Sequence, residues 1–203
     1  CEGMEEKIVF HTEIHLFLDA LKKEGYDAKF FDGSLIDEEM ILKELKKNIP
    51  KKIIYYVYTP YIRNNKEFME KLSNISKLYL VIVPFFWREK ILKEFPFVED
   101  VFYDGEKMTG VSIKDAKVDY EGIDLKQYID DKRAFPVLIS KYCPFQCTFC
   151  NAQKTGLAER NLEIVRDEID YLIKKGVKKF KLGSNLLTIK KSSYFKVCEM
   201  MKD

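Results

Sequence analysis

The sequence has no apolar run approaching the roughly 20 residues that a helix needs to cross a bilayer. Its longest apolar run, residues 78–87, contains Pro84 and is followed at once by Arg88-Glu89-Lys90. A run of this length, flanked in this way, is typical of a buried strand. We therefore expect no membrane-spanning segment.

An excess of charge of one sign is also missing. Lysine and arginine number 35 and aspartate and glutamate 33, which gives a formal net charge of +2. This near balance gives no electrostatic indication of a nucleic-acid partner. Lysines such as Lys22-Lys23 and those within residues 43–47 fall in amphipathic patterns, so we expect them on solvated helix faces.

The sequence gives no indication of a disulfide framework, and we expect no signal peptide. The five cysteines are an odd number, and three of them lie within residues 143–150. This clustering favours a reducing, cytoplasmic compartment and a metal site. The chain opens with Cys1-Glu2-Gly3 and stops within a repeating strand–helix pattern, so we expect it to be a fragment of a longer protein.

What the first half of the chain does contain is strand and helix in alternation. Apolar periodicity predicts helices around residues 14–25, 37–50, 68–72 and 88–94, and strands at 28–31, 53–58, 78–83 and 101–103. Such alternation is typical of a mostly parallel sheet covered by helices. We therefore predict an α/β, doubly wound, Rossmann-like domain over residues 1–105.

The second half predicts a linker and then a new α/β beginning. Residues 106–134 are expected to form the linker, with a small hairpin from 111–113 and 117–120. Beyond it we predict a strand at 135–140, a helix at 162–173, a strand at 177–182 and a helix at 189–201. Residues 135–203 therefore supply two βα units, the incomplete start of a partial TIM-like barrel.

The residues with the clearest chemistry are Cys143, Cys147 and Cys150, spaced C-x3-C-x2-C directly after a predicted strand. Thiolates are the ligands of iron–sulfur clusters and of zinc. Structural zinc takes four ligands, commonly in pairs, and the cysteines and histidines elsewhere in this chain form no such pair. Three thiolates leave a fourth position open, which is typical of a catalytic centre.

With this motif the chain resembles the radical S-adenosylmethionine superfamily. The resemblance implies that Cys143, Cys147 and Cys150 hold a 4Fe–4S cluster and that Phe149 lies beside the adenine of S-adenosylmethionine. It implies an oxygen-sensitive enzyme that cleaves S-adenosylmethionine reductively to a 5′-deoxyadenosyl radical. Electrons would come from a flavodoxin or ferredoxin, and the substrate is undefined.

The first half resembles the cobalamin-binding-type domain of the methyltransferase and methylthiotransferase-like branch of that superfamily. Points of likeness are the helix at residues 16–25, the turn at 58–60 and the stretch at 93–96. Two departures argue against cobalamin, which the resemblance would allow as a cofactor. The D-x-H-x-x-G motif is absent, and bulky side chains at 84–87 stand where relatives often have a glycine pair.

A further departure concerns the binding of S-adenosylmethionine. Relatives place an acidic segment after the second strand of the radical domain, where this chain has Ser184-Asn185. These side chains can accept hydrogen bonds from the cofactor's amino group but carry no charge. We therefore expect the chain to bind the cluster, to bind S-adenosylmethionine poorly and not to turn over.

Two alternatives remain open. The three cysteines could hold zinc in a binding module, with Cys198 or a histidine (His11 or His15) as the fourth ligand. The chain could instead be a degenerate, non-catalytic iron–sulfur relative. We expect Arg160 to be solvated, and Glu168 to lie on the polar side of its helix.

Overall fold

The computed structural model describes residues 10–83, 88–120, 123–129, 133–145, 147–148, 157–184, 188 and 190–202. It is an α/β structure in which the described residues group into two compact units. Unit 1 takes its residues from 1–30, 112–148 and 154–203, and unit 2 from 31–111. The predicted boundaries at residues 105 and 135 cut the chain into continuous pieces, whereas unit 1 joins the N-terminal helix to the C-terminal half.

Unit 2 is built on a parallel sheet whose strands stand in the order β1-β2-β3. Its described elements are α2 (Glu38–Lys47), β1 (Lys52–Tyr58), the 3-10 helix η1 (Thr59–Tyr61), α3 (Lys66–Ser73), β2 (Lys77–Val83), α4 (Arg88–Glu94), β3 (Asp100–Phe102) and α5 (Gly105–Thr109). These bounds confirm the strands and helices predicted between residues 37 and 103.

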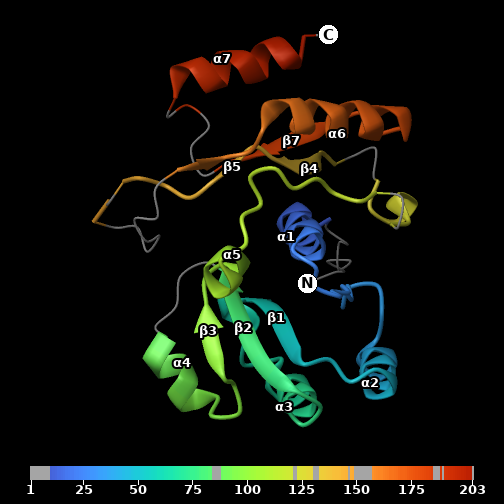
Figure 1. The fold of residues 1–203 in the computed structure, drawn as a ribbon, viewed down its shortest axis with the longest axis vertical. Coiled ribbons are helices and arrows are strands. Elements are labelled where there is room, and N and C mark those ends of the chain that lie inside the picture. Colours follow the sequence, from blue (N-terminus) through green and yellow to red (C-terminus); the bar gives the residue numbers. More distant parts are fainter. Residues whose placement is uncertain are drawn as a thin grey trace, which may run out of the picture. The chain divides into compact units, whose positions relative to one another are not determined.

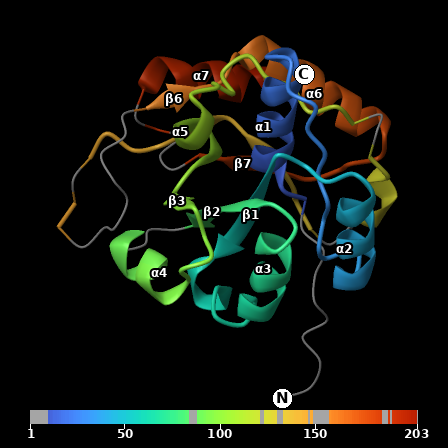
Figure 2. The ribbon, with the colours of Figure 1, turned by 60° about the horizontal axis from the view of Figure 1, so that its bottom comes forward.

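The core of unit 2 follows from alternation along β2. Leu78, Leu80 and Ile82 point to one face of the sheet and are fully buried. They belong to one apolar cluster with Phe68 and Met69 of α3, and α2 and α4 also contribute side chains to this cluster. The helices therefore share one face of the sheet, as Figure 2 illustrates for α3 and α4.

The strand order of unit 2 can be compared with the order that the predicted doubly wound topology requires. In a doubly wound sheet the order reverses at a switch point, so that successive helices cover opposite faces. The three described strands of unit 2 progress in one direction without a reversal. Right-handed crossovers stepping in one direction place their helices on the same face, which agrees with the shared apolar cluster.

Unit 1 has a second parallel pairing, of β4 with β7. Its described elements are α1 (Thr12–Lys23), the 3-10 helix η2 (Leu125–Gln127), β4 (Phe135–Leu138), β5 (Ser140–Lys141), β6 (Ala158–Glu159), α6 (Leu162–Lys174), β7 (Phe180–Gly183) and α7 (Lys191–Met200). Figure 1 shows α6 and α1 on either side of the β4–β7 pair.

Both helices anchor to β4. The Thr12 hydroxyl of α1 donates to the Pro136 carbonyl over 2.6 Å, and the ring centroid of Phe10 lies 4.9 Å from that of Phe135. On α6, Val165 and Leu172 are fully buried. The N-terminal helix therefore completes the core of unit 1 rather than that of the sheet that follows it in sequence.

Helix ends lie close to their sequence signals. The Asp37 carboxylate accepts from the Met40 amide at the start of α2, over 2.7 Å. Gly25 and Gly176, just past α1 and α6, have φ of 84° and 98°, the left-handed conformation that glycine adopts at little cost.

Across the described parts of the chain, no helix combines the length and the apolar character needed to span a membrane.

Two predicted extended segments are not strands. Residues 28–31 and the proposed hairpin at 111–120 have no sheet pairing. In the second segment side chains bond to the backbone instead. The Lys117 amide donates to the Asp19 carboxylate over 3.0 Å, and the Val118 amide to the Glu168 carboxylate over 2.9 Å.

Candidate functional site

The candidate site is the cysteine segment, residues 142–157, which connects β5 to β6. These short strands pair antiparallel, with Ser140 opposite Glu159 and Lys141 opposite Ala158. This pairing holds the two ends of the segment side by side, directly after β4. The cysteine motif is therefore attached at the carboxyl end of a parallel strand, where α/β sheets commonly bind ligands.

The carboxyl end of β7 lies beside the base of the cysteine segment. The Ile139 amide donates to the Gly183 carbonyl over 2.8 Å, and the hydroxyls of Ser140 and Ser184 share a hydrogen bond of 2.6 Å. A Cβ at Gly183 would lie 3.4 Å from the Leu138 side chain, so the two strands approach closely here. Ser184, which we expect to contact S-adenosylmethionine, thus lies at the base of the predicted cluster segment.

Two of the three predicted cluster ligands are described. Cys143 is half-buried and Cys147 exposed, and both are free thiols. Cys150 lies outside the described residues, as do Phe149 and Asn185 of the predicted cofactor site. Within the residues that are described, and so without Cys150, no three His, Cys, Asp or Glu side chains gather to hold a metal ion.

The residues leading into Cys143 are held in an unusual local conformation. Tyr142 has a φ of 69°, in the left-handed region that bulky side chains rarely adopt. Beside it, the Lys141 ammonium forms a 2.8 Å ion pair with Glu13 and lies 5.0 Å from the centre of the Tyr142 ring. The Lys141 side chain is only 8% exposed, so this pairing with Glu13 compensates a charge largely removed from water.

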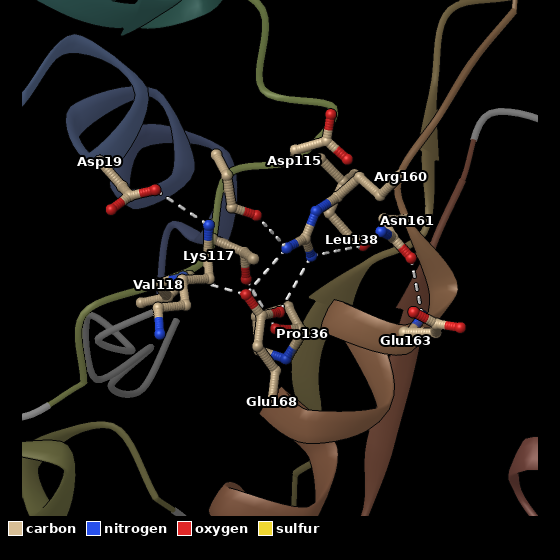
Figure 3. A network of polar contacts seen from close by, with 12 residues as sticks. Asp19, Asp115, Lys117, Val118, Pro136, Leu138, Arg160, Asn161, Glu163 and Glu168 are labelled. Carbon is tan, nitrogen blue, oxygen red and sulfur yellow. Dashed lines mark hydrogen bonds and ion pairs between the residues drawn. The ribbon is translucent and has the colours of Figure 1, made fainter. Parts of the chain in front are cut away.

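A buried ion pair lies where the chain leaves the cysteine segment (Figure 3). The two terminal nitrogens of Arg160 donate to the two carboxylate oxygens of Glu168 over 2.9 and 2.8 Å. The same nitrogens donate to the carbonyls of Leu138, over 3.0 Å, and Ala116, over 2.6 Å. Arg160 therefore joins the end of β4, the 112–120 segment and α6 at one point.

Burial of this pair corrects the expectation of a solvated Arg160 and a polar-face Glu168. Both side chains are at most 4% exposed. The sequence carries a signal for the burial of Glu168 in its spacing from the apolar residues of α6. Glu168 stands three residues after Val165 and four before Leu172, on the apolar side of α6. A charge at such a position needs a buried partner.

The electrostatic effect of this pair extends to Tyr120. Burial raises the pKa of the Tyr120 phenol, and the nearby Glu168 carboxylate raises this pKa further, while Arg160 opposes them. The Tyr120 ring stacks on Tyr171 of α6, with 5.5 Å between ring centroids. The phenol therefore stays neutral and acts as a packing side chain.

Two other residues that we considered as ligands, His15 and Cys198, contact neighbouring aromatic side chains. His15 stacks on Phe10 at 4.6 Å between ring centroids and meets the Phe30 ring edge-on at 4.9 Å. Cys198 is half-buried on α7, and its hydrogen bond with Tyr194 raises the pKa of that phenol. These surroundings are those of core and helix-surface residues.

Fold and site together define an α/β protein with a cysteine segment at the carboxyl end of a parallel strand pair. Comparisons with protein families, with curated proteins and with solved structures found no match to this chain.

Proposed function

We propose that this chain is part of a radical S-adenosylmethionine enzyme and binds a 4Fe–4S cluster through Cys143, Cys147 and Cys150. One observation carries the proposal. The C-x3-C-x2-C motif lies on a segment whose ends are paired by β5 and β6, at the carboxyl end of β4. The adjoining end of β7 contributes Ser184, 2.6 Å from the Ser140 hydroxyl.

The donor set fits such a cluster. Cys143 and Cys147 are free thiols with access to solvent, and thiolates are the usual ligands of iron–sulfur clusters. When bound together with S-adenosylmethionine, the cluster would supply the electron that yields a 5′-deoxyadenosyl radical. Ser184 would offer a hydroxyl to the cofactor, and Lys141 and Glu13 would fix the backbone before Cys143.

The proposal extends to the architecture and the setting of the protein. The β4–α6–β7–α7 order of unit 1 supports the start of a partial TIM-like barrel, and the β1–β3 sheet supports a cobalamin-binding-type relative that has lost its cofactor. We place the protein in a reducing cytoplasm, with a flavodoxin or ferredoxin as electron donor. Its reaction would belong to the methyltransferase or methylthiotransferase-like class.

Anaerobic reconstitution with iron and sulfide tests the proposal. We expect about four iron atoms and a matching amount of sulfide per chain. The variants Cys143→Ser, Cys147→Ser and Cys150→Ser should each lose most of this iron. Cys198→Ser is the matched control, because it removes a half-buried thiol from α7 and should keep the full iron content.

The same samples separate the alternatives. A change in the electron paramagnetic resonance signal of the reduced cluster on adding S-adenosylmethionine would support an open iron position. An unchanged signal would indicate the degenerate relative, and tightly bound zinc in place of iron would contradict the proposal. Sustained formation of 5′-deoxyadenosine would refute our expectation that this chain does not turn over.

A further inference from the structure

The near-zero net charge of the chain conceals a strongly basic region. Residues 174–202 contain nine lysines and a single acidic residue, Glu199, which gives this stretch a net charge of +8. Because the whole chain carries +2, all other residues together carry −6. The charge is therefore segregated, and segregation of this kind indicates an interaction surface more strongly than the net charge does.

All nine lysine side chains are exposed. They come from the end of α6, the approach to β7, β7 itself and α7, all within unit 1 (Figure 1). We call this set the basic surface: Lys174, Lys175, Lys178, Lys179, Lys181, Lys190, Lys191, Lys196 and Lys202.

The lysines of the basic surface differ in whether an acidic partner neutralises them. Lys190 has such a partner, because it forms an ion pair with Glu159 of β6, which places the start of α7 beside the end of the cysteine segment. Lys175 contacts an aromatic ring, with its ammonium 5.3 Å from the centre of Tyr171. Lys174, Lys196 and Lys202 have no ion pair within the described chain.

An exposed aromatic side chain lies beside one of these lysines. Phe195 is 52% exposed, and the Lys191 ammonium lies 5.8 Å from the centre of its ring. Val197 is the only buried residue of α7, and five of the ten residues of this helix are exposed. An exposed ring with a neighbouring ammonium can stack on a base while the ammonium neutralises an adjacent phosphate.

We propose that the basic surface binds single-stranded nucleic acid, with its lysines on the phosphate backbone and Phe195 stacked on a base. A membrane surface fits less well, because α7 has no continuous apolar face to insert. An acidic protein also fits less well, because lysine is depleted in the cores of protein interfaces. This inference goes beyond the proposed function and does not depend on the cluster.

A fluorescence-anisotropy titration of the full chain with a labelled oligouridylate of about 20 nucleotides tests it. We expect the logarithm of the binding constant to fall linearly with the logarithm of the salt concentration. The expected slope is about −0.7 for each phosphate neutralised. The triple variant Lys191→Gln, Lys196→Gln, Lys202→Gln should reduce this slope by about 2. Phe195→Ser should weaken binding without changing the slope.

The matched control is the triple variant Lys43→Gln, Lys46→Gln, Lys51→Gln, which removes the same charge from exposed positions of unit 2. It should retain the wild-type slope. Equal weakening in both triple variants would overturn the proposal, because attraction would then follow net charge alone. So would the absence of binding at low salt, or binding to anionic vesicles or an acidic protein in preference to the oligonucleotide.

Discussion

At the scale of single residues, Arg160 and Glu168 form an ion pair that is almost completely buried. Removing two charges from water is costly, and the cost is recovered only when hydrogen bonds satisfy both partners. Here Glu168 accepts from Arg160 and from the Val118 amide, while Arg160 also donates to two backbone carbonyls. The pair therefore fixes the 112–120 segment in the absence of a strand ladder.

Replacing Glu168 by glutamine tests this role. The substitution keeps the shape of the side chain but leaves the Arg160 charge buried without a counter-ion. We expect the free energy of unfolding to fall by about 3–5 kcal/mol, measured by urea denaturation. Glu163→Gln on the exposed side of α6 is the control and should change it by at most about 0.5 kcal/mol.

A double-mutant cycle with Arg160→Met adds a second criterion. The doubly substituted chain should lose less stability than the two single variants summed, because neither charge is then left alone. Strict additivity would show that the two residues act independently, against the geometry of Figure 3.

At the scale of elements, the Glu38 carboxylate of α2 acts electrostatically on Tyr55 of β1. Burial in the strand raises the pKa of Tyr55 to about 12, and the Glu38 carboxylate at the start of α2 contributes to the rise. The neutral phenol is therefore favoured in the folded state over the unfolded state, where the pKa is about 10. This contribution to stability is complete below pH 10 and is lost as the pH rises from 10 through 12.

Unfolding measurements across this pH range should show the effect. Tyr55→Phe is expected to flatten the decline in stability between pH 10 and 12, because the titrating group is gone. Tyr61→Phe, at an exposed position of the same unit, serves as the comparison. A Tyr55→Phe curve that stays parallel to the wild type would contradict a raised pKa for this half-buried phenol.

The elements also show how far the sequence predicts this fold. Apolar periodicity was sufficient to place β2 and α6. Leu78, Leu80 and Ile82 of β2 and Val165, Ile169 and Leu172 of α6 are buried, whereas Ile173 at the end of α6 is 53% exposed. It failed at residues 28–31, where Phe30 packs against His15 without a partner strand. A strand needs a neighbour to receive its backbone groups, and local composition does not reveal whether one is present.

Prediction of the candidate site was uneven for a similar reason. The cysteine spacing is local, so the motif and its position after β4 could be read from the sequence. The contact between Ser140 and Ser184 and the ion pair of Arg160 with Glu168 depend on the β4–β7 pairing and on packing around α6. Such long-range contacts leave at most a weak trace in one sequence.

At the scale of the whole molecule, the chain forms two compact units, each with its own buried residues. Ile82 belongs to the apolar cluster of unit 2, and Ile169 is buried on α6 of unit 1. Ile82→Val and Ile169→Val should each lower the free energy of unfolding by about 0.5–1.5 kcal/mol.

Combining the two substitutions tests the division into units. Since the two side chains belong to separate cores, their effects should add to within about 0.5 kcal/mol in urea denaturation followed by circular dichroism. Ile82→Val combined with Leu80→Val, within one core, is the comparison in which coupling is expected. A coupling well above 0.5 kcal/mol between Ile82 and Ile169 would indicate one continuous core.

The pairing of β5 with β6 also has an evolutionary consequence. Because four residues fix both ends of the cysteine segment, the residues between them can be exchanged or lengthened while the β4–β7 pair stays unchanged. Doubling the length of such a segment costs only about 0.6 kcal/mol in closure entropy. Residues of the cysteine segment can thus be exchanged with little effect on the stability of the scaffold.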